Sequence, residues 1–329
     1  MTVLVTGSAG FIGMHVAEGL LARGHAVVGY DNFSPYYDVR LKRDREACLR
    51  RLPGYAGLDA DLCDAAALNR CFDAHRFDAV CHLAAQPGVR YSIEHPEVYE
   101  ASNLRGFLNV LEACRHHSAP RLVYASSSSV YGGNTRLPFR EDDPVDRPVS
   151  LYAATKKANE LMAHTYTHLF GLQTVGLRFF TVYGPWGRPD MAVWLFTEAM
   201  LAGRPIQVFN HGRLQRDFTY VDDIRDGVIA CIEAAGLDRY ELFNIGNNRP
   251  EPLMDMIAVL AGALGVEPRL EMLPMQPGDV PATFADISRI QSRLGFAPRT
   301  PIREGLPRFV AWYREYRERR GRAAQGGSP

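Results

Sequence analysis

The sequence predicts an α/β fold in which a doubly wound parallel sheet is joined to a smaller C-terminal α/β lobe. Two observations support this prediction. The chain opens as strand, helix and strand within its first 30 residues, and the same alternation continues to about residue 180. Strands that alternate with helices of this length are typical of a parallel sheet with helices on both faces.

The first unit follows from the apolar spacing. Residues 3–6 are a short β-branched run, and apolar residues then recur at four-residue spacing from Ile12 to Leu20 until Gly24 provides a stop. This pattern predicts a helix, and residues 26–30 form a second buried strand. Later elements are expected as strands at 78–83, 121–125 and 174–179, and as helices at 97–114 and around residue 152.

Beyond about residue 182 the alternation gives way to Pro- and Gly-rich connections between shorter elements. We therefore assign residues 1–180 to the large sheet and residues 181–316 to a second, substrate-binding lobe. A helix-then-strand pattern within 221–246 predicts that this segment returns to the large sheet. Residues 317–329 are rich in Arg, Gly and Ser, which predicts a disordered tail.

Charge and composition narrow the class of protein. Lys plus Arg and Asp plus Glu both number 37, and 47% of the 329 residues are hydrophobic. This balance is typical of a globular protein and argues against nucleic acid or a membrane as partner. The six cysteines are scattered without a Cys-x-x-Cys pair, so reduced thiols are expected and no metal cluster is indicated. Neither a signal segment nor a spanning stretch is evident, and we expect a cytoplasmic protein.

A Gly-x-x-Gly-x-x-Gly pattern lies between the first strand and the first helix. Gly7 permits a tight turn, Gly10 lets the backbone approach a pyrophosphate, and Gly13 allows the helix to pack closely on the sheet. Asp31, at the end of the second strand, would accept hydrogen bonds from the ribose hydroxyls and repel a 2′-phosphate. The sequence therefore predicts a Rossmann dinucleotide site that takes NAD rather than NADP.

Tyr152 and Lys156 are four residues apart in a stretch that is expected to be helical. At this spacing a phenol and an ammonium share one helix face. A phenol titrates near ~10 in water, and a neighbouring cation favours its ionised form, so the pair can supply a base for an alcohol proton. Taken alone, such a pair is more often a half-buried ring beside a solvated charge. The NAD site in the same chain provides the hydride acceptor that favours catalysis.

The glycine spacing, the Tyr-x-x-x-Lys pair and the upstream serines resemble the extended short-chain dehydrogenase/reductase family over nearly the whole chain. This resemblance implies that Ser127 hydrogen-bonds the reacting alcohol and that Tyr152 is the base. It further implies that Lys156 lowers the tyrosine pKa and holds the nicotinamide ribose. Asp61 is a candidate to close over the adenine, although an aspartate that starts a loop is equally often a helix cap. Besides Tyr152, Lys156, the three glycines and Asp31, cofactor contacts are expected at Phe11, Ile12, Asn32, Asp61, Leu62, Leu83, Ala84, Ala85, Asn103 and Phe179.

The serines at 126–129 reduce the number of reactions that this chain could catalyse. In dehydratases of this family the segment before Val-Tyr-Gly looks like Thr-Asp-Glu, and in UDP-glucuronate decarboxylases it looks like Ser-Glu. This chain has Ser127, Ser128 and Ser129 at these places. Hydroxyls cannot supply the acid and base of an elimination at neutral pH. Oxidation and re-reduction of the sugar remain.

Segments 32–42, 86–90 and 180–191 resemble UDP-glucuronate 4-epimerases in particular. UDP-galactose 4-epimerases look like Asn rather than Thr at position 181 and lack the Arg-Pro-Asp-Met run that begins at Arg188. The resemblance implies 4-epimerisation of UDP-glucuronate to UDP-galacturonate through a transient 4-keto intermediate, with NAD held by the enzyme. The alternatives are a UDP-glucose/UDP-galactose or N-acetylhexosamine 4-epimerase and, less favoured, a UDP-glucuronate decarboxylase.

An anionic sugar needs hydroxyl donors and a nearby cation, which Ser127, Ser128, Thr181 and Arg188 provide. The non-functional alternative is that Arg188, Pro189 and Asp190 only form a turn in which Asp190 is a capping residue. Arg216 matches an arginine that binds the diphosphate in sister epimerases; the alternative is an ordinary surface arginine. Gln276 is predicted to contact the substrate at a position where many sister enzymes have a second arginine; the alternative is a glutamine in a turn. Further substrate contacts are expected at Pro87, Gly88, Val89, Arg90, Met191 and Val208.

Helices at 96–114 and 150–170 resemble the pair that forms a four-helix dimer interface in this family, which implies a homodimer. A rival of a different class is a non-catalytic NAD-binding or scaffold protein, since fold alone does not guarantee chemistry. The intact Ser127, Tyr152 and Lys156 argue against that rival.

Overall fold

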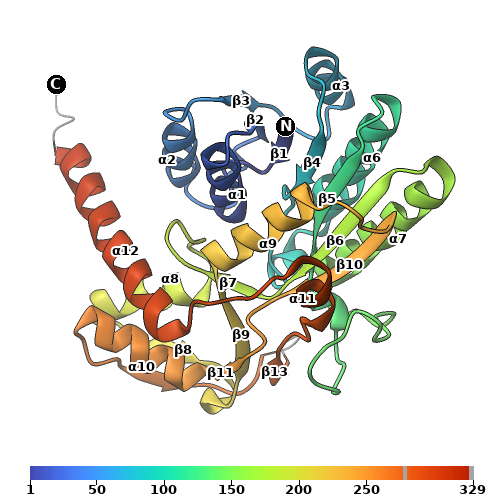
Figure 1. The fold of residues 1–329 in the computed structure, drawn as a ribbon. Coiled ribbons are helices and arrows are strands. Elements are labelled where there is room, and N and C mark those ends of the chain that lie inside the picture. Colours follow the sequence, from blue (N-terminus) through green and yellow to red (C-terminus); the bar gives the residue numbers. More distant parts are fainter. Residues whose placement is uncertain (277–279, 326–329) are drawn as a thin grey trace.

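The computed structural model describes residues 1–276 and 280–325, and it contains a large sheet covered by helices and a second, smaller lobe (Figure 1). The large sheet has seven strands in the order β10-β6-β5-β4-β1-β2-β3, and all of its pairs are parallel. The predicted Rossmann doubly wound fold is therefore confirmed. The strands are β1 (Thr2–Thr6), β2 (Ala26–Asp31), β3 (Tyr55–Asp59), β4 (Ala79–His82), β5 (Arg121–Ser127), β6 (Gln173–Phe179) and β10 (Tyr240–Ile245).

Helices pack on both faces of this sheet and enclose two separate apolar cores. One face carries α1 (Phe11–Ala22), α2 (Val39–Leu49) and α9 (Val221–Glu233). The other carries α3 (Ala65–Ala74), α6 (Gly106–His116) and α7 (Leu151–Phe170). The expected helix at 97–114 is divided into α5 (Pro96–Tyr99), a π-helical stretch η1 (Glu100–Arg105) and α6, and it is preceded by α4 (Tyr91–Glu94).

The order of strands reverses between β1 and β4, and this reversal positions the site. In an open parallel sheet a crevice forms at such a point, beyond the carboxyl ends of the strands. The glycine loop follows β1, residues 83–90 follow β4, and the serines follow β5 as η2 (Ser128–Tyr131). All three segments therefore meet at one edge of the sheet.

The second lobe is built from short strands and three helices around an aromatic core. Its core includes Trp194, Phe309 and Tyr313, and the partly buried Trp312 packs against it. Its elements are β7 (Thr181–Tyr183), α8 (Ala192–Leu201), β8 (Ile206–Val208), η3 (Phe209–Gly212), β9 (Gln215–Tyr220), β11 (Pro250–Pro252), α10 (Leu253–Leu264), β12 (Leu270–Met272), β13 (Ala282–Thr283) and α12 (Ile302–Gln325); α11 (Ser288–Leu294) packs against β10 of the large sheet. Because β10 pairs with β6, the segment that contains α9 and β10 lies with the large sheet.

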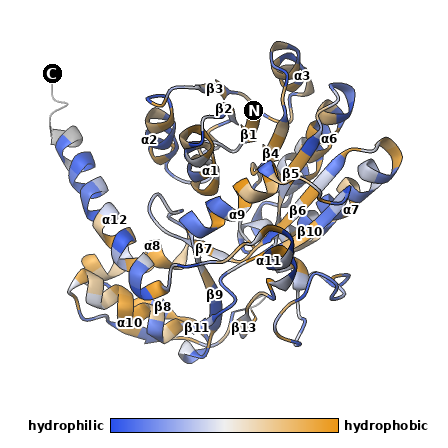
Figure 2. Ribbon diagram, viewed as in Figure 1, coloured by the Kyte–Doolittle hydropathy of each residue, from blue (hydrophilic) through white to orange (hydrophobic). Residues whose placement is uncertain are grey.

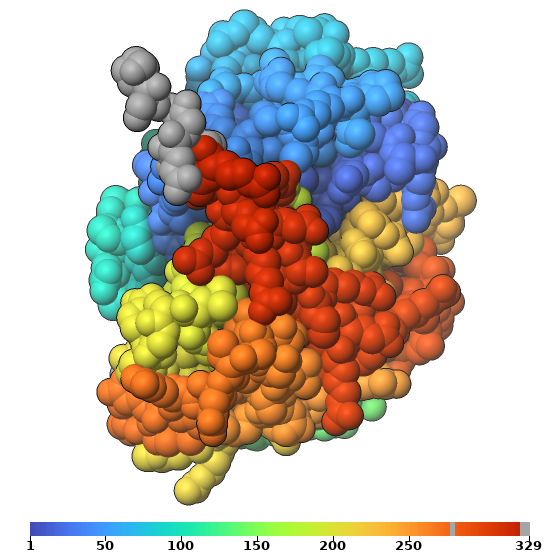
Figure 3. Space-filling view, turned by 90° about the vertical axis from the view of Figure 1, so that its left-hand side faces the viewer, coloured from blue at the N-terminus to red at the C-terminus, as the bar shows by residue number. Residues whose placement is uncertain are grey.

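The C-terminal helix α12 joins the two lobes. In the space-filling view α12 lies across both the lower lobe and the N-terminal part (Figure 3). The Tyr316 hydroxyl donates to Asp44 at 2.8 Å, and Arg320 donates to Asp38 at 3.1 Å. The sequence predicts a disordered tail from residue 317, yet α12 continues to Gln325. The last turns of α12 are hydrophilic (Figure 2), so composition alone did not predict a helix there. The helix is held by the hydrogen bonds to Asp44 and Asp38, which are distant in the sequence. Residues 326–329 lie outside the described part of the chain.

In the described ranges no helix is both long and apolar enough to cross a membrane.

Candidate active site

A cavity of about 410 Å³ opens where the predicted segments meet. It extends from the glycine loop past β4 and β5 to residues 179–191, which lead into the second lobe. The structure brings together in this cavity 15 of the residues predicted to contact the cofactor: Gly7, Gly10, Phe11, Ile12, Gly13, Asp31, Asn32, Asp61, Leu62, Leu83, Ala84, Ala85, Tyr152, Lys156 and Phe179. Predicted substrate residues that line it are Pro87, Gly88, Val89, Ser127, Ser128, Thr181, Arg188 and Met191.

The glycine loop is packed so closely that side chains are excluded from it. A Cβ atom on Gly13 would lie 2.0 Å from the Gly7 carbonyl oxygen, and one on Gly7 would lie 2.7 Å from the Ala84 nitrogen. Gly7 also has a φ of 72°, in the left-handed region. Helix α1 begins after Gly10, which has no side chain to cap the first backbone N–H groups. Those groups remain available to an anion in the cavity.

Asp31 lies at the end of β2, lines the cavity and is buried. Its carboxylate accepts from the backbone N–H of Ala9 at 3.1 Å and of Phe33 at 2.8 Å. Burial raises the pKa of this carboxyl, and the nearby Lys42 ammonium opposes that shift. Asp61 accepts from the Cys63 N–H at 2.7 Å and does not cap α3, because Asp64 does so. Its other carboxylate oxygen accepts from the Asn32 side chain at 2.8 Å, and both residues line the cavity.

Tyr152 and Lys156 lie in the first turns of α7 and share one face. The helix is capped by Ser150, whose hydroxyl accepts from the Ala153 N–H at 3.1 Å. The Lys156 ammonium donates to the Ala125 carbonyl at 2.9 Å, and burial lowers its pKa to about 8. Both side chains line the cavity, as the i, i+4 spacing predicts.

The electrostatics at Tyr152 differ from the sequence expectation. Burial raises the pKa of its phenol, while a hydrogen bond with Ser127 and the charge of Arg188 lower it. The sequence predicts Lys156 for that lowering role. In the structure the Lys156 ammonium donates to the carbonyl of Ala125, which consumes part of its donor capacity. Arg188, which lies far from Tyr152 in the chain, contributes a positive charge that local spacing cannot show.

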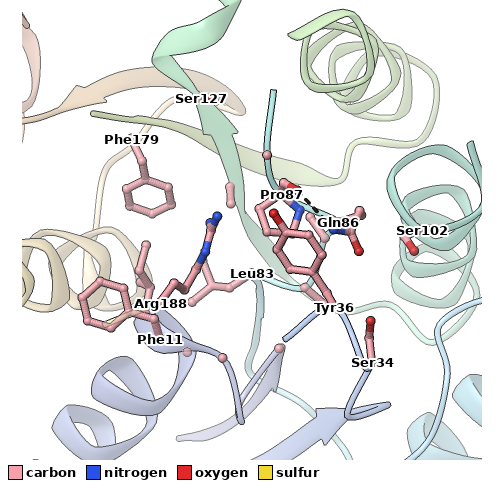
Figure 4. Close-up of a pocket in the computed structure, with 18 of the residues that line it drawn as sticks. Phe11, Ser34, Tyr36, Leu83, Gln86, Pro87, Ser102, Ser127, Phe179 and Arg188 are labelled. Carbon is pink, nitrogen blue, oxygen red and sulfur yellow. Dashed lines mark hydrogen bonds between the residues drawn. The ribbon is translucent and has the colours of Figure 1, made fainter. Parts of the chain in front are cut away.

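Arg188 points into the cavity between Phe179 and Tyr36 (Figure 4). Its Nε donates to the Asp190 carboxylate at 3.0 Å, and the Tyr36 hydroxyl donates to the same carboxylate at 3.0 Å. Burial acts to lower the pKa of Arg188, but Asp190 outweighs it and the pKa is raised, so the guanidinium is permanently charged. Asp190 thus orients a cation, rather than only capping a turn.

A buried network that the sequence did not reveal fixes strand β5, which carries Ser127, to α7. The Ser126 hydroxyl donates to Glu160 at 2.7 Å, and Arg178 donates to the same carboxylate at 2.8 and 2.9 Å. All three side chains are almost fully buried. Because β5 and α7 carry Ser127 and Tyr152, this network sets the spacing between them.

Five predicted residues do not line the cavity. Asn103 lies behind it and pairs with the backbone of Gln86, donating to its carbonyl and accepting from its N–H. Val208, which is predicted to contact the substrate, is fully buried in the second lobe. Both departures reflect which face of an element is buried, and spacing alone does not decide this.

The other three lie at the second lobe. Arg90 is exposed, with its guanidinium 5.3 Å from the centroid of the Phe209 ring. Arg216 lies on β9 and donates to the Gln215 carbonyl at 2.9 Å. The Gln276 Oε1 is buried without a hydrogen-bond partner in the described part of the chain. Further residues line the cavity that were not predicted as site residues. Some lie in segments whose resemblance or serine run gave a signal: Ser34, Tyr36, Tyr37, Lys42, Gln86, Ser126, Ser129, Phe180 and Val182. The others had no signal in the sequence: Tyr30, Ala60, Ser102 and Ala125.

Comparison with known proteins agrees with this geometry. Residues 3–246 match the model of the NAD dependent epimerase/dehydratase family. The chain belongs to this family. Among its relatives, UDP-glucuronate 4-epimerase 4 of Arabidopsis thaliana is 48% identical over 96% of this chain and 76% of its own length. A probable UDP-glucuronate 4-epimerase of Rhizobium meliloti is 44% identical over 95% of this chain and 97% of its own.

A solved structure supports the same assignment to the epimerase/dehydratase family. UDP-glucuronic acid 4-epimerase from Bacillus cereus, in complex with UDP-glucuronic acid and NAD, superposes with a TM-score of 0.90. It is 33% identical to this chain and covers 96% of this chain and 100% of its own. In this chain the close-packed glycine loop, the uncapped start of α1 and the buried Asp31 carboxylate fit a dinucleotide.

Proposed function

We propose that this protein is an NAD-dependent UDP-glucuronate 4-epimerase, which interconverts UDP-glucuronate and UDP-galacturonate. One observation favours this substrate above others. The cavity combines the Tyr152 phenol with three hydroxyls, from Ser127, Ser128 and Thr181, and with the Arg188 guanidinium. This is a binding surface for a carboxylate placed beside a base that acts on an alcohol.

In the proposed mechanism Tyr152 takes the proton of the sugar 4-hydroxyl and later returns it to the same oxygen. The Ser127 hydroxyl hydrogen-bonds this oxygen and holds the reacting alcohol against Tyr152. Bound NAD supplies the hydride acceptor and then the hydride donor for C4, so the reaction has no net redox change. The 4-keto sugar turns within the cavity between the two transfers, and the opposite face of C4 receives the hydride.

The intermediate is a β-keto acid, which is prone to lose carbon dioxide. The enzyme must therefore hold the carboxylate away from the alignment that favours decarboxylation. We assign this task to Ser127, Ser128 and Thr181, with Arg188 as the nearby cation. Ser128 and Ser129 carry hydroxyls at the positions where the resemblance places carboxyl groups in sister dehydratases and decarboxylases. Elimination therefore lacks its acid and base. Decarboxylation lacks the glutamate, and the hold on the carboxylate opposes the uncatalysed loss of carbon dioxide.

A product assay tests this function. The purified enzyme is incubated with UDP-glucuronate, and the nucleotide sugars are separated. We expect UDP-galacturonate as the product, whereas UDP-pentose with carbon dioxide would contradict the proposal. UDP-glucose serves as the neutral competitor, and Arg188→Ala should lower kcat/KM for UDP-glucuronate by more than for UDP-glucose. Equal losses would favour the neutral 4-epimerase instead.

We also propose that the protein is a homodimer in the cytoplasm. Apolar side chains are exposed on α6 and α7, among them Leu108 at 40%, Leu161 at 57% and Leu169 at 61%. Exposed apolar side chains on two helices that pack together are typical of a subunit interface, and the second copy would cover them. All six cysteines are free thiols, which is typical of a reducing compartment.

A further inference from the structure

A buried arginine outside the cavity joins the cofactor side of the site to the substrate side. Arg45 lies on α2 and is 0% exposed. Its Nη1 donates to the Ala9 carbonyl of the glycine loop at 3.1 Å and to the Tyr37 hydroxyl at 2.7 Å. Its Nη2 donates to the carbonyls of Trp186 and Gly187 at 2.6 and 3.1 Å. One guanidinium therefore connects three segments that the chain keeps far apart.

The contact at the glycine loop leads directly to Asp31. The N–H of Ala9 donates to the Asp31 carboxylate at 3.1 Å, and the carbonyl of the same residue accepts from Arg45. Asp31 is the carboxylate proposed to bind the adenosine ribose. Any change in how Asp31 and the glycine loop are held therefore reaches Arg45 through one residue.

The contact at the other end precedes Arg188. Trp186 has a φ of 60°, which is unfavourable for a residue with a large side chain. The short hydrogen bond from Arg45 to its carbonyl stabilises this conformation. His15 on α1 adds a parallel contact to the Pro185 carbonyl at 2.9 Å, and burial lowers the pKa of His15 to about 4, so its ring is neutral near pH 7. Arg188 thus extends from a loop fastened to α1 and α2.

Packing alone does not account for Arg45. A buried guanidinium is costly unless a carboxylate pairs with it. Asp31 acts on Arg45 through space, but none of the described residues forms an ion pair with it. Its Nε has no hydrogen-bond partner among those residues either. What a guanidinium offers here is a planar fork whose two ends reach two different loops at once, which a lysine cannot reproduce.

We propose that Arg45 is a positioning residue that transmits occupancy of the cofactor site to Arg188. A filled cofactor site fixes Asp31 and the glycine loop, Arg45 then fixes residues 186 and 187, and Arg188 is held toward the sugar. The inference rests on the proposed function only in that Arg188 contacts the substrate.

Hydrogen exchange tests the link without any turnover. NAD-free and NAD-loaded protein are compared for backbone exchange in residues 184–191. In the wild type, NAD should slow exchange there. In Arg45→Met, NAD should still bind but leave exchange in this segment unchanged. Arg51→Met, at an exposed arginine just after α2, is the matched control and should respond like the wild type. A wild-type response in Arg45→Met overturns the proposal.

A double-mutant cycle tests the catalytic consequence. Arg45→Met should lower kcat/KM for UDP-glucuronate by about 10- to 100-fold, because displaced binding groups cost about that much. In an Arg188→Ala background the same change should cost less than about threefold, since the effects of two residues that act through one loop do not add. If the fold-loss in kcat/KM of the double variant equals the product of the two single losses, the proposal is overturned. Arg45→Lys, which keeps the charge but not the fork, replaces Arg45→Met if the latter does not fold. If the wild type does not turn over UDP-glucuronate, the proposed function fails while the exchange test still decides the role of Arg45.

Discussion

Burial acts on the two central titrating residues in opposite directions. It raises the pKa of the Tyr152 phenol and lowers the pKa of the Lys156 ammonium to about 8. Both shifts disfavour the charged forms that the mechanism uses. The folded protein offsets them with the Ser127 hydroxyl, the Ala125 carbonyl and the charge of Arg188. The site therefore maintains its reactive state at a cost to stability.

Lys156→Met should separate stability from activity. A lowered pKa means that protonated Lys156 costs the folded state stability at pH 7, and that this cost shrinks as pH rises above about 8. We expect the Tm of NAD-free Lys156→Met at pH 7 to be within about 3 °C of the wild type or above it. Its advantage should shrink toward pH 10, while kcat falls by at least about 10²-fold. A markedly lower Tm would show that the bond to Ala125 outweighs desolvation.

The charge of Arg188 should be visible in the pH profile. Activity requires ionised Tyr152, so kcat rises with pH as the phenol loses its proton. Burial raises that pKa and Arg188 opposes the rise. In Arg188→Met the rising limb of kcat, measured at saturating UDP-glucuronate, should therefore move to higher pH. The profile of Arg51→Met should not move. A shift to lower pH in Arg188→Met contradicts this account.

Among the elements, those with local signals were predictable and those fixed by distant contacts were not. Parallel strands buried on both faces are continuous apolar runs, and the glycine loop and the Tyr152–Lys156 pair depend on spacing within a few residues. The length of α12 could not be predicted, because the helix is held by contacts between residues far apart in the sequence, such as the hydrogen bond from Tyr316 to Asp44. The sequence could not show that Asn103 and Val208 do not line the cavity, because side-chain direction depends on tertiary packing.

The close packing of Gly13 at the start of α1 predicts that a larger residue there disrupts the glycine loop. In Gly13→Ala the new Cβ would meet the Gly7 carbonyl at 2.0 Å, so the loop must open. We expect NAD to be lost from the purified protein and Tm to fall by at least about 4 °C. Gly262→Ala in α10 is exposed with open space around it, and should raise Tm slightly because alanine favours a helix. Retained NAD in Gly13→Ala would contradict the tight loop.

At the scale of the whole molecule, the active site is assembled from both lobes. The large sheet supplies Asp31, Ser127 and Tyr152, while the segment that leads into the second lobe supplies Thr181 and Arg188. Helix α12 joins the lobes on the outside through contacts with α2 (Figure 3). The residues proposed to bind the cofactor and those proposed to select the sugar are thus held by one framework.

The exposed apolar face of α6 and α7 predicts self-association. Leu161→Arg places a charge at a side chain that is 57% exposed, and should convert a dimer to a monomer in light scattering without lowering the monomer's helix content. Leu195→Arg, at a 49% exposed leucine on α8, is the matched control and should remain dimeric. A Leu161→Arg protein that stays dimeric places the interface elsewhere.

The central claim is that C4 of UDP-glucuronate gives up its hydride and receives the same hydride on the opposite face. The most direct measurement uses UDP-glucuronate labelled with deuterium at C4, with the product analysed by NMR and mass spectrometry. The account predicts UDP-galacturonate that keeps the deuterium at C4, with no label released to water. Loss of the label to solvent, or its recovery in a UDP-pentose, would contradict it.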